Sequence, residues 1–426
     1  MEKLIINGGR RLDGRVKIQG AKNSVLPILA AAVINGQKNI IHNCPRLSDV
    51  DKTVEILEGL GCRVKREGND IEVDSSCADA WTIPEALMRE LRSSIIFMGA
   101  ILSRFGVAAV SMPGGCEIGN RPIDLHLKAL TRMGIGISEE HGFIKCVYEN
   151  PHGTYIHLDF PSVGATENIM LTACALKGET TITNAAKEPE ICDLADFLNK
   201  MGVRVTGAGT DTVRISGTKK YNAVEHTVIP DRIVGATYFA AAAVTGGRAA
   251  AEGARADHMR SMISVLREMG CTFENDGELL VMNAPKRLGS VHTVRTMPYP
   301  GFPTDIQSPF MTAAAVARGT SVFVENIFEN RFKHVEELVR MGADISVDGR
   351  VAVVRGVARL GGATVMARDL RGGAALAVAG LCAEGVTEVG NMCYINRGYE
   401  DIEHALGCLG ADVKKIKENC DAESAL

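Results

Sequence analysis

The stretch DFLNKMGVRV, residues 196–205, decides the fold because five other stretches of the chain share its pattern. Each is typical of a helix that ends in Leu-Gly or Met-Gly and is followed by a short strand. A glycine directly after a helix readily takes the left-handed conformation that ends it. The pattern therefore predicts six repeats of about 70 residues. The glycines that end the six helices are Gly61, Gly134, Gly202, Gly270, Gly342 and Gly410. The spacings between successive glycines are 73, 68, 68, 72 and 68 residues.

A second, Ala-rich helix followed by a strand alternates with the first unit, as in LPILAAAVINGQKNIIH (26–42) and FMTAAAVARGTSVFVEN (310–326). With a further strand in most repeats, each repeat is βαβαββ-like. Helices and strands that alternate at this spacing predict an α/β fold. The six repeats predict two domains of three repeats each.

The domain boundary is expected near KYNAVEHTVIPDRIVG (220–235), where polar residues and a proline separate the third repeat from the fourth. The sixth repeat ends in a polar tail, whereas the N-terminus has a surplus strand, KLIING (3–8). We therefore expect residues 22–229 to form the first domain. Residues 1–21 and 230–426 are expected to form the second, with the N-terminal strand completing it. A ligand is expected in the cleft between the domains.

Composition excludes several classes of protein. The formal net charge of −4 argues against a nucleic-acid-binding protein, which usually carries a basic patch. The sequence has no apolar run long enough to predict membrane insertion or a signal peptide. It contains 12 cysteines but no CxxC motif, which is typical of a protein of the reducing cytoplasm. Four of them, in apolar periodic segments, are expected in the core: Cys62, Cys174, Cys382 and Cys408.

No metal site is predicted, because the ten histidines show no ligand spacing. The starts of the repeated helices instead carry cations: Lys22, Arg92, Arg371 and, at a following turn, Arg397. A helix start suits anions, because its free N–H groups and its dipole are positive there. If these ends meet in the cleft, the site is cationic, and it suits a polyanion such as a sugar nucleotide or a phosphorylated acid.

Ordinary structural roles are also open for these segments. Asn23 and Asp305 are typical helix caps, and Arg92 is typical of a solvated surface arginine. Ser162 and Gly164, in DFPSVGATENIM (159–170), suit either phosphate binding or a plain turn.

Cys116 lies in the loop PGGCEIGNRPID (113–124), between glycines and five residues before Arg121. A nearby cation lowers the pKa of a thiol and makes it a nucleophile or a proton donor near neutral pH. The alternative is a small residue packed in a turn, but its glycine neighbours offer little apolar packing.

Eight motifs in order along the chain are together similar to those of the enolpyruvyl transferase family, within it the enzymes that act on UDP-N-acetylglucosamine. Synthases of enolpyruvylshikimate phosphate share the fold but not the PGGC loop. The motifs are GAKNSVLPILAA, PGGCEIGNRPIDLHL, SVGATENIM, KEPEICDLADFLNKMG, PGFPTDIQSPFM, ENIFENRF, DLRGGAALAVAGL and NRGYEDIE.

The resemblance implies a two-domain inside-out α/β barrel with three repeats per domain and a central cleft. It implies transfer of the enolpyruvyl group of phosphoenolpyruvate to the 3-hydroxyl of UDP-N-acetylglucosamine, with release of phosphate, as the first committed step of peptidoglycan precursor synthesis. It implies no cofactor and no metal, and its partners are these two small molecules. Open alternatives are an enolpyruvyl transferase acting on another acceptor and a non-catalytic sugar-nucleotide-binding paralogue.

The resemblance also implies a role for each of several residues. Cys116 is implied to protonate C3 of phosphoenolpyruvate, and Asp305 to be the general base. The phosphoenolpyruvate contacts are implied to be Lys22, Asn23, Arg121 and Arg397, with Lys22 and Arg397 also catalytic. Asp369 and Arg371 are implied to be supporting residues. The implied sugar-nucleotide contacts are Asn23, Arg92, Arg121, Pro122, Ile123, Asp124, Leu125, Ser162, Val163, Gly164, Asp305 and Ile327. Phe160 stands where some relatives carry a lysine that contacts the nucleotide.

Overall fold

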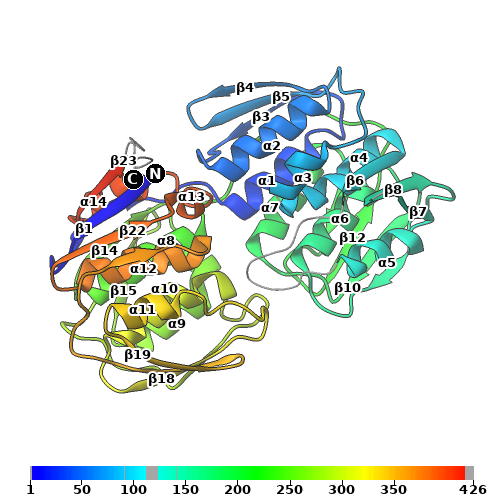
Figure 1. The fold of residues 1–426 in the computed structure, drawn as a ribbon. Coiled ribbons are helices and arrows are strands. Elements are labelled where there is room, and N and C mark those ends of the chain that lie inside the picture. The colour runs from blue at the N-terminus through cyan, green and yellow to red at the C-terminus, as the bar shows by residue number, and fades with distance from the viewer. Residues whose placement is uncertain (1, 91, 112–122, 141, 418–426) are drawn as a thin grey trace, which may run out of the picture. The chain divides into compact units, whose positions relative to one another are not determined.

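The computed structural model describes residues 2–90, 92–111, 123–140 and 142–417. These residues form two compact units. The terminal unit comprises residues 2–19 and 230–417, and the middle unit comprises the described residues between 20 and 229. Each unit has its own hydrophobic core, so the two are described separately. Figure 1 labels their helices and strands, which alternate along the chain as the predicted α/β class requires.

The middle unit contains three sheets among its described residues, with strand orders β13-β3-β5-β4, β11-β12-β10-β9 and β6-β8-β7. Its helices are α1 (Lys22–Ala31), α2 (Ser48–Gly59), α3 (Glu85–Glu90), η1 (Arg92–Ile96), α4 (Phe97–Phe105), α5 (Asp124–Arg132), α6 (Val163–Ala173) and α7 (Pro189–Lys200). Its strands are β3 (Lys38–His42), β4 (Arg63–Glu67), β5 (Asp70–Asp74), β6 (Val107–Ser111), β7 (Ile135–Glu140), β8 (Phe143–Tyr148), β9 (Tyr155–His157), β10 (Glu179–Thr183), β11 (Arg204–Thr206), β12 (Thr212–Ser216) and β13 (Glu225–Thr227).

The terminal unit also contains three sheets among its described residues, ordered β15-β16-β14-β2, β17-β18-β20-β19 and β21-β22-β1-β23. Its helices are α8 (Arg232–Val244), η2 (Ala256–Met259), α9 (Arg260–Glu268), α10 (Thr304–Ala315), α11 (Val335–Arg340), α12 (Leu370–Cys382), α13 (Met392–Ile395) and α14 (Ile402–Cys408). Its strands are β1 (Glu2–Asn7), β2 (Asp13–Lys17), β14 (Arg248–Glu252), β15 (Thr272–Asn275), β16 (Leu279–Asn283), β17 (Thr293–Arg295), β18 (Thr320–Val324), β19 (Asp344–Asp348), β20 (Val351–Arg355), β21 (Thr364–Met366), β22 (Val386–Gly390) and β23 (Asp412–Lys417).

Two kinds of helix build each repeat. The Ala-rich helices, such as α8 and α12, are buried along almost their whole length, as a helix that is apolar on every side must be. Helices α8, α10 and α12 pack against one another in the terminal unit, and α4 packs against α6 and α1 in the middle unit. The other kind, such as α9, buries only one face, with Met262, Ile263 and Leu266.

The six repeated glycines end these one-sided helices as predicted. All six have positive φ, between 78° at Gly134 and 102° at Gly202. At Gly202 the backbone N–H donates to the Asn199 carbonyl at 3.0 Å, and the next N–H, of Val203, reaches the Leu198 carbonyl at 3.0 Å. These two bonds satisfy carbonyls that the end of the helix leaves without partners.

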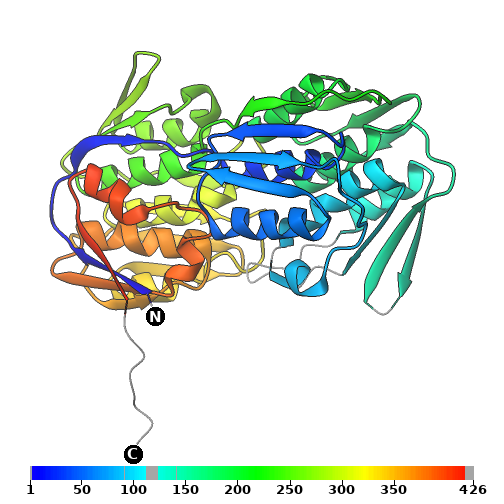
Figure 2. The ribbon, with the colours of Figure 1, turned by 90° about the horizontal axis from the view of Figure 1, so that it is seen from above.

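The N-terminal strand lies inside the last sheet. β1 pairs antiparallel with both β22 and β23, with Leu4 opposite Val389 on one side and opposite Lys415 on the other. It holds the position that β20 holds in the preceding repeat. Figures 1 and 2 show the first strand, in blue, beside the last, in red.

Two further strands pair outside their own repeat. β2 directly precedes α1 of the middle unit, but it pairs parallel with β14 of the terminal unit. β13 directly precedes α8 of the terminal unit, but it pairs parallel with β3 of the middle unit. Each of the two chain segments that pass between the units therefore adds an edge strand to a sheet of one unit and then begins a helix of the other unit.

Within the described part of the chain, no helix combines the length and apolar character needed to cross a membrane. In the same residues, no group of three or more His, Cys, Asp or Glu side chains is placed to hold a metal ion.

Candidate active site

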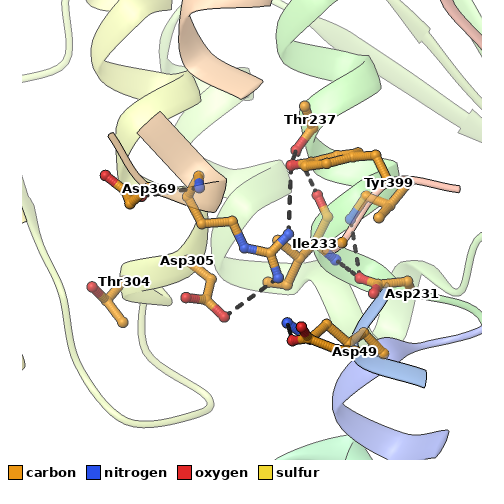
Figure 3. A network of polar contacts seen from close by, with 12 residues as sticks. Asp49, Asp231, Ile233, Thr237, Thr304, Asp305, Asp369 and Tyr399 are labelled. Atoms are coloured by element: carbon orange, nitrogen blue, oxygen red, sulfur yellow. Dashed lines mark hydrogen bonds and ion pairs between the residues drawn. The ribbon is translucent and has the colours of Figure 1, made fainter. Parts of the chain in front are cut away.

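The terminal unit brings the starts of three buried helices together, and Figure 3 shows Asp231, Asp305 and Asp369 at these starts. Asp231 caps α8, because its carboxylate accepts hydrogen bonds from the N–H groups of Ile233 at 2.8 Å and Val234 at 3.0 Å. Asp369 caps α12 in the same way, through the N–H groups that follow it. These helix starts direct their positive dipole ends to one region of the unit.

Asp305 differs from its two neighbours because it is not a cap. The N-cap of α10 is Pro303, and Asp305 is the second residue of the helix. Its carboxylate pairs with Arg331 Nη2 at 2.8 Å and with Arg371 Nη2 at 3.6 Å. Both arginine side chains are 3% exposed, whereas Asp305 is 28% exposed. The carboxylate thus reaches solvent while it pairs with two buried guanidinium groups, and the capping alternative is wrong.

Arg371 is fixed from several directions. Its backbone N–H binds the Asp369 cap at 3.0 Å, and its Nη1 lies 3.5 Å from the Tyr399 hydroxyl. That hydroxyl is 2.9 Å from Thr237 Oγ1, as Figure 3 shows. Burial lowers the pKa of Arg371, but the charge of Asp305 and the Tyr399 contact raise it overall. The guanidinium therefore stays charged.

His334 adds no charge to this cluster. It is the N-cap residue of α11 and lies beside Asp369 and Arg331. Burial lowers the pKa of His334 to about 4, although Asp369 opposes this shift. Its two ring nitrogens find no hydrogen-bond partner among the described residues. The positive charge near Asp305 thus comes from the guanidinium groups and not from an imidazole.

Two more of the expected residues lie in the terminal unit. Arg397 is half-buried and follows α13, with its backbone N–H 3.3 Å from the Tyr394 carbonyl. Ile327 is half-buried, and its N–H donates to a Glu325 carboxylate oxygen at 2.8 Å.

In the middle unit, Lys22 begins α1, and its side chain is 11% exposed. It forms an ion pair with Asp49 of α2, whose side chain is 6% exposed. A buried ammonium is tolerated only when it is paired in this way. The N-cap of α1 is Ala21, so the capping alternative for Asn23 is also wrong, and Asn23 is a half-buried residue of the first turn.

The third residue of α1, Ser24, fixes this turn to the rest of the unit. Its hydroxyl donates to Asp193 of α7. Asp193 also lies 2.9 Å from His226 Nε2 and accepts the Ile229 N–H at 3.2 Å. All three side chains of this buried Ser24–Asp193–His226 network are less than 9% exposed.

The structure brings two predicted nucleotide-binding segments together. Ser162 caps α6, accepting the Ala165 N–H at 3.3 Å, and Val163 and Gly164 begin that helix. Ile123, Asp124 and Leu125 lie at the start of α5. His126 connects the two starts: its ring lies 3.3 Å from the position of a Cβ added to Gly164, and its Nδ1 is 2.7 Å from Asn168 of α6.

Three expected residues, Cys116, Arg121 and Pro122, lie outside the described residues. Arg92 begins η1, five residues before α4, and its side chain lies outside the described part.

Three residues of the site were not found from the sequence: Arg331, Asp49 and Glu325. Arg331 lies in ENIFENRF and Glu325 begins it, but nothing in this motif shows which of its polar residues face Asp305. Asp49 follows Ser48 in a segment typical of a helix start, where an acidic residue usually complements the dipole and stays exposed. The sequence does not show that the Asp49 side chain is buried.

Comparisons with known proteins agree on one family. The family model described as EPSP synthase (3-phosphoshikimate 1-carboxyvinyltransferase) matches residues 6–406. The chain is 54% identical over 416 residues to UDP-N-acetylglucosamine 1-carboxyvinyltransferase 2 of Caldanaerobacter subterraneus, covering 98% of this chain and 100% of the relative. It is 48% identical to UDP-N-acetylglucosamine 1-carboxyvinyltransferase 1 of Symbiobacterium thermophilum, covering 97% of this chain and 95% of the relative.

Solved structures agree with this fold. The crystal structure of the enolpyruvyl transferase NikO from Streptomyces tendae matches with a TM-score of 0.88 and 25% identity, covering 97% of this chain and 98% of that one. EPSP synthase from Acinetobacter baumannii matches with a TM-score of 0.73 and 17% identity, covering 98% of this chain and 100% of that one, which bears on the fold alone. The predicted α/β class is confirmed.

Proposed function

Because the chain belongs to the enolpyruvyl transferase family described by the EPSP synthase model, we propose that it transfers the enolpyruvyl group of phosphoenolpyruvate to the 3-hydroxyl of UDP-N-acetylglucosamine. Phosphate is the second product, and the reaction begins peptidoglycan precursor synthesis. The observation that carries this choice of acceptor is the 54% identity, over the full length, to a relative named for UDP-N-acetylglucosamine. The family model alone would leave shikimate 3-phosphate equally open.

The chemistry requires a proton donor and a carboxylate. Protonation of C3 of phosphoenolpyruvate develops positive charge at C2, the sugar hydroxyl adds there and loses its proton, and phosphate and a C3 proton then leave. We assign the C3 proton to Cys116. Asp305 suits the opposite task, since its partly exposed carboxylate pairs with Arg331 and Arg371. A carboxylate so paired is a weak base, which suffices for a hydroxyl that attacks a cationic carbon.

The proposed phosphoenolpyruvate contacts are Lys22, Asn23, Arg121 and Arg397. Lys22 is well suited because its ammonium lies in a buried place, paired with Asp49, so that little water has to be removed from it when an anion binds. Asp369 and Arg371 support the site: Asp369 caps the helix from which Arg371 reaches Asp305.

The proposed sugar-nucleotide contacts lie at helix starts in the middle unit, and Asp305 and Ile327 complete them. The starts of α5 and α6 offer backbone N–H groups to a diphosphate. Phe160 is 45% exposed beside this segment, so the cationic contact to the nucleotide that some relatives make there is either replaced by an apolar one or lost. The contacts at the helix starts are Asn23, Arg92, Arg121, Pro122, Ile123, Asp124, Leu125, Ser162, Val163 and Gly164.

A cytoplasmic location belongs to the same proposal. All ten cysteines that the structure describes are free thiols, which suits a reducing compartment.

Phosphate release tests the proposed function. Purified protein is incubated with phosphoenolpyruvate and either UDP-N-acetylglucosamine or shikimate 3-phosphate. Release that depends on UDP-N-acetylglucosamine is expected. Release only with shikimate 3-phosphate would indicate another acceptor, and binding of the sugar nucleotide without any release would indicate a non-catalytic paralogue.

A further inference from the structure

Glu325 is a buried carboxylate at the end of β18 that accepts four hydrogen bonds. Its side chain is almost inaccessible, since the residue is 1% exposed. Oε1 accepts from the Thr296 hydroxyl at 2.8 Å and from the N–H groups of Ile327 at 2.8 Å and Phe328 at 3.1 Å. Oε2 accepts from the Thr304 hydroxyl at 2.9 Å. A buried carboxylate is acceptor-only, so four converging donors compensate its desolvation.

These bonds join two segments that are distant in sequence. Thr304 begins α10 and directly precedes Asp305. Ile327 and Phe328 belong to the segment that leads to Arg331, which in turn donates to Asp305 at 2.8 Å. Arg331 also makes long contacts of 3.4 Å to the Thr304 carbonyl. Glu325 therefore binds both the start of α10, which carries Asp305, and the loop that leads to Arg331.

The hydrogen bonds of Glu325 go to Thr304 and to the loop that leads to Arg331, so its action on Asp305 must pass through these two segments. We propose that Glu325 is a positioning residue that fixes Asp305 against Arg331, so that the carboxylate faces the acceptor hydroxyl. The inference rests on the proposed function for the role of Asp305, but the fixed geometry of the pair is a property of the resting protein.

The effect on turnover is expected to be large. A displacement of about 1 Å at a reacting group costs on the order of 10²-fold in rate. Loosening the start of α10 by part of that distance should lower kcat by about 10- to 100-fold. Because Asp305 is proposed both to contact the sugar nucleotide and to act in the chemical step, kcat should fall by a larger factor than the KM for the sugar nucleotide rises.

The first test removes one hydroxyl. Thr304→Val cuts the Glu325 link to α10 while keeping the side-chain shape. The control, Thr296→Val, cuts a hydrogen bond to the same carboxylate and also the bond that the Asn326 N–H donates to this hydroxyl at 2.8 Å, and neither bond leads to α10. We expect the low kcat only in Thr304→Val, although both variants lose stability. Thr304→Ser keeps the hydroxyl and should restore kcat.

The second test asks whether Glu325 acts through Thr304. Glu325→Gln is preferred to Glu325→Ala, because a shortened side chain would leave four donors unpaired and endanger folding. Glu325→Gln combined with Thr304→Val should lower kcat no further than the more damaging single variant. Additive losses would overturn the inference, as would equal kcat values for Thr304→Val and Thr296→Val.

A readout in the resting protein separates failure of this inference from failure of the proposed function. The Nε–H of Arg331 lies 3.4 Å from the Thr304 carbonyl, so its nuclear magnetic resonance signal, assigned with Arg331→Lys, reports without any substrate how Arg331 sits against the start of α10. We expect it to shift or exchange faster with water in Thr304→Val but not in Thr296→Val. An unchanged signal in Thr304→Val would overturn the positioning role. Absence of phosphate release by the unmodified protein would overturn only the function.

Discussion

Replacing Ile6 of the N-terminal strand with alanine should destabilise the terminal unit and leave the middle unit intact. Ile6 is 0% exposed, and its Cδ1 lies 3.0 Å from the position of a Cβ added to Gly380 of α12, so it packs directly on that helix. Ile→Ala at such a site costs about 2–5 kcal/mol, from lost burial and from the cavity left behind. This is a large part of the 5–15 kcal/mol that is typical for a whole domain.

Hydrogen exchange followed by mass spectrometry measures the two units separately. A loss of about 3 kcal/mol speeds exchange on the order of 10²-fold for amides that exchange through unfolding of the unit. We expect this acceleration in β22 and β23, which pair with β1, and in α12, which packs on it. Amides of α1 and α6 should keep their rates.

Asn7→Ala is the matched control, because Asn7 lies in the same strand with an exposed side chain. Its cost should stay within about 0.5 kcal/mol. Equal acceleration in both units after Ile6→Ala, or no difference between Ile6→Ala and Asn7→Ala, would refute the assignment of the strand to the terminal unit.

Three further predictions concern the buried network, a buried acid and the thiol. Asp193→Ala leaves Ser24 and His226 without their shared carboxylate and should lower stability by about 3–5 kcal/mol in denaturant titrations; a loss below 1 kcal/mol would contradict this. Burial raises the pKa of Glu167 well above 4.5, so its contribution to stability is complete below about pH 4.5 and is lost as the pH rises. The melting temperature of Glu167→Gln minus that of the unmodified protein should therefore increase from pH 5 to pH 8. A difference that stays constant over this range would refute the raised pKa of Glu167. Cys116→Ala should abolish turnover at an unchanged melting temperature, and near-normal turnover would remove the thiol from the mechanism.

Local chemistry explains which parts of the fold could be predicted. The left-handed cap after a helix needs only a glycine at the right place, and all six repeated glycines have positive φ. The parallel pairing of β2 with β14 and of β13 with β3 could not be predicted, because each added edge strand depends on a segment more than 180 residues away. Cys408 was expected in the core but is exposed, 3.5 Å from His404 on the same helix.

Only part of the candidate site could be predicted from the sequence, for a similar reason. Repeated helix starts pointed to Lys22, Asp305 and Arg371, because a helix start is recognisable locally. Their partners Asp49 and Arg331 come from other elements, and only the folded chain shows those ion pairs. The same limit made capping a reasonable alternative for Asp305, which pairs with two arginines instead.

In the proposed reaction, the chain adds and then removes a proton at C3 of phosphoenolpyruvate while it transfers the enolpyruvyl group to the sugar nucleotide. Mass spectrometry of the product formed in D₂O tests both parts at once. We expect enolpyruvyl-UDP-N-acetylglucosamine that carries deuterium in its vinyl group, together with an equal amount of phosphate. A product without deuterium would contradict the proton transfer, and no sugar-nucleotide product would contradict the transferase itself.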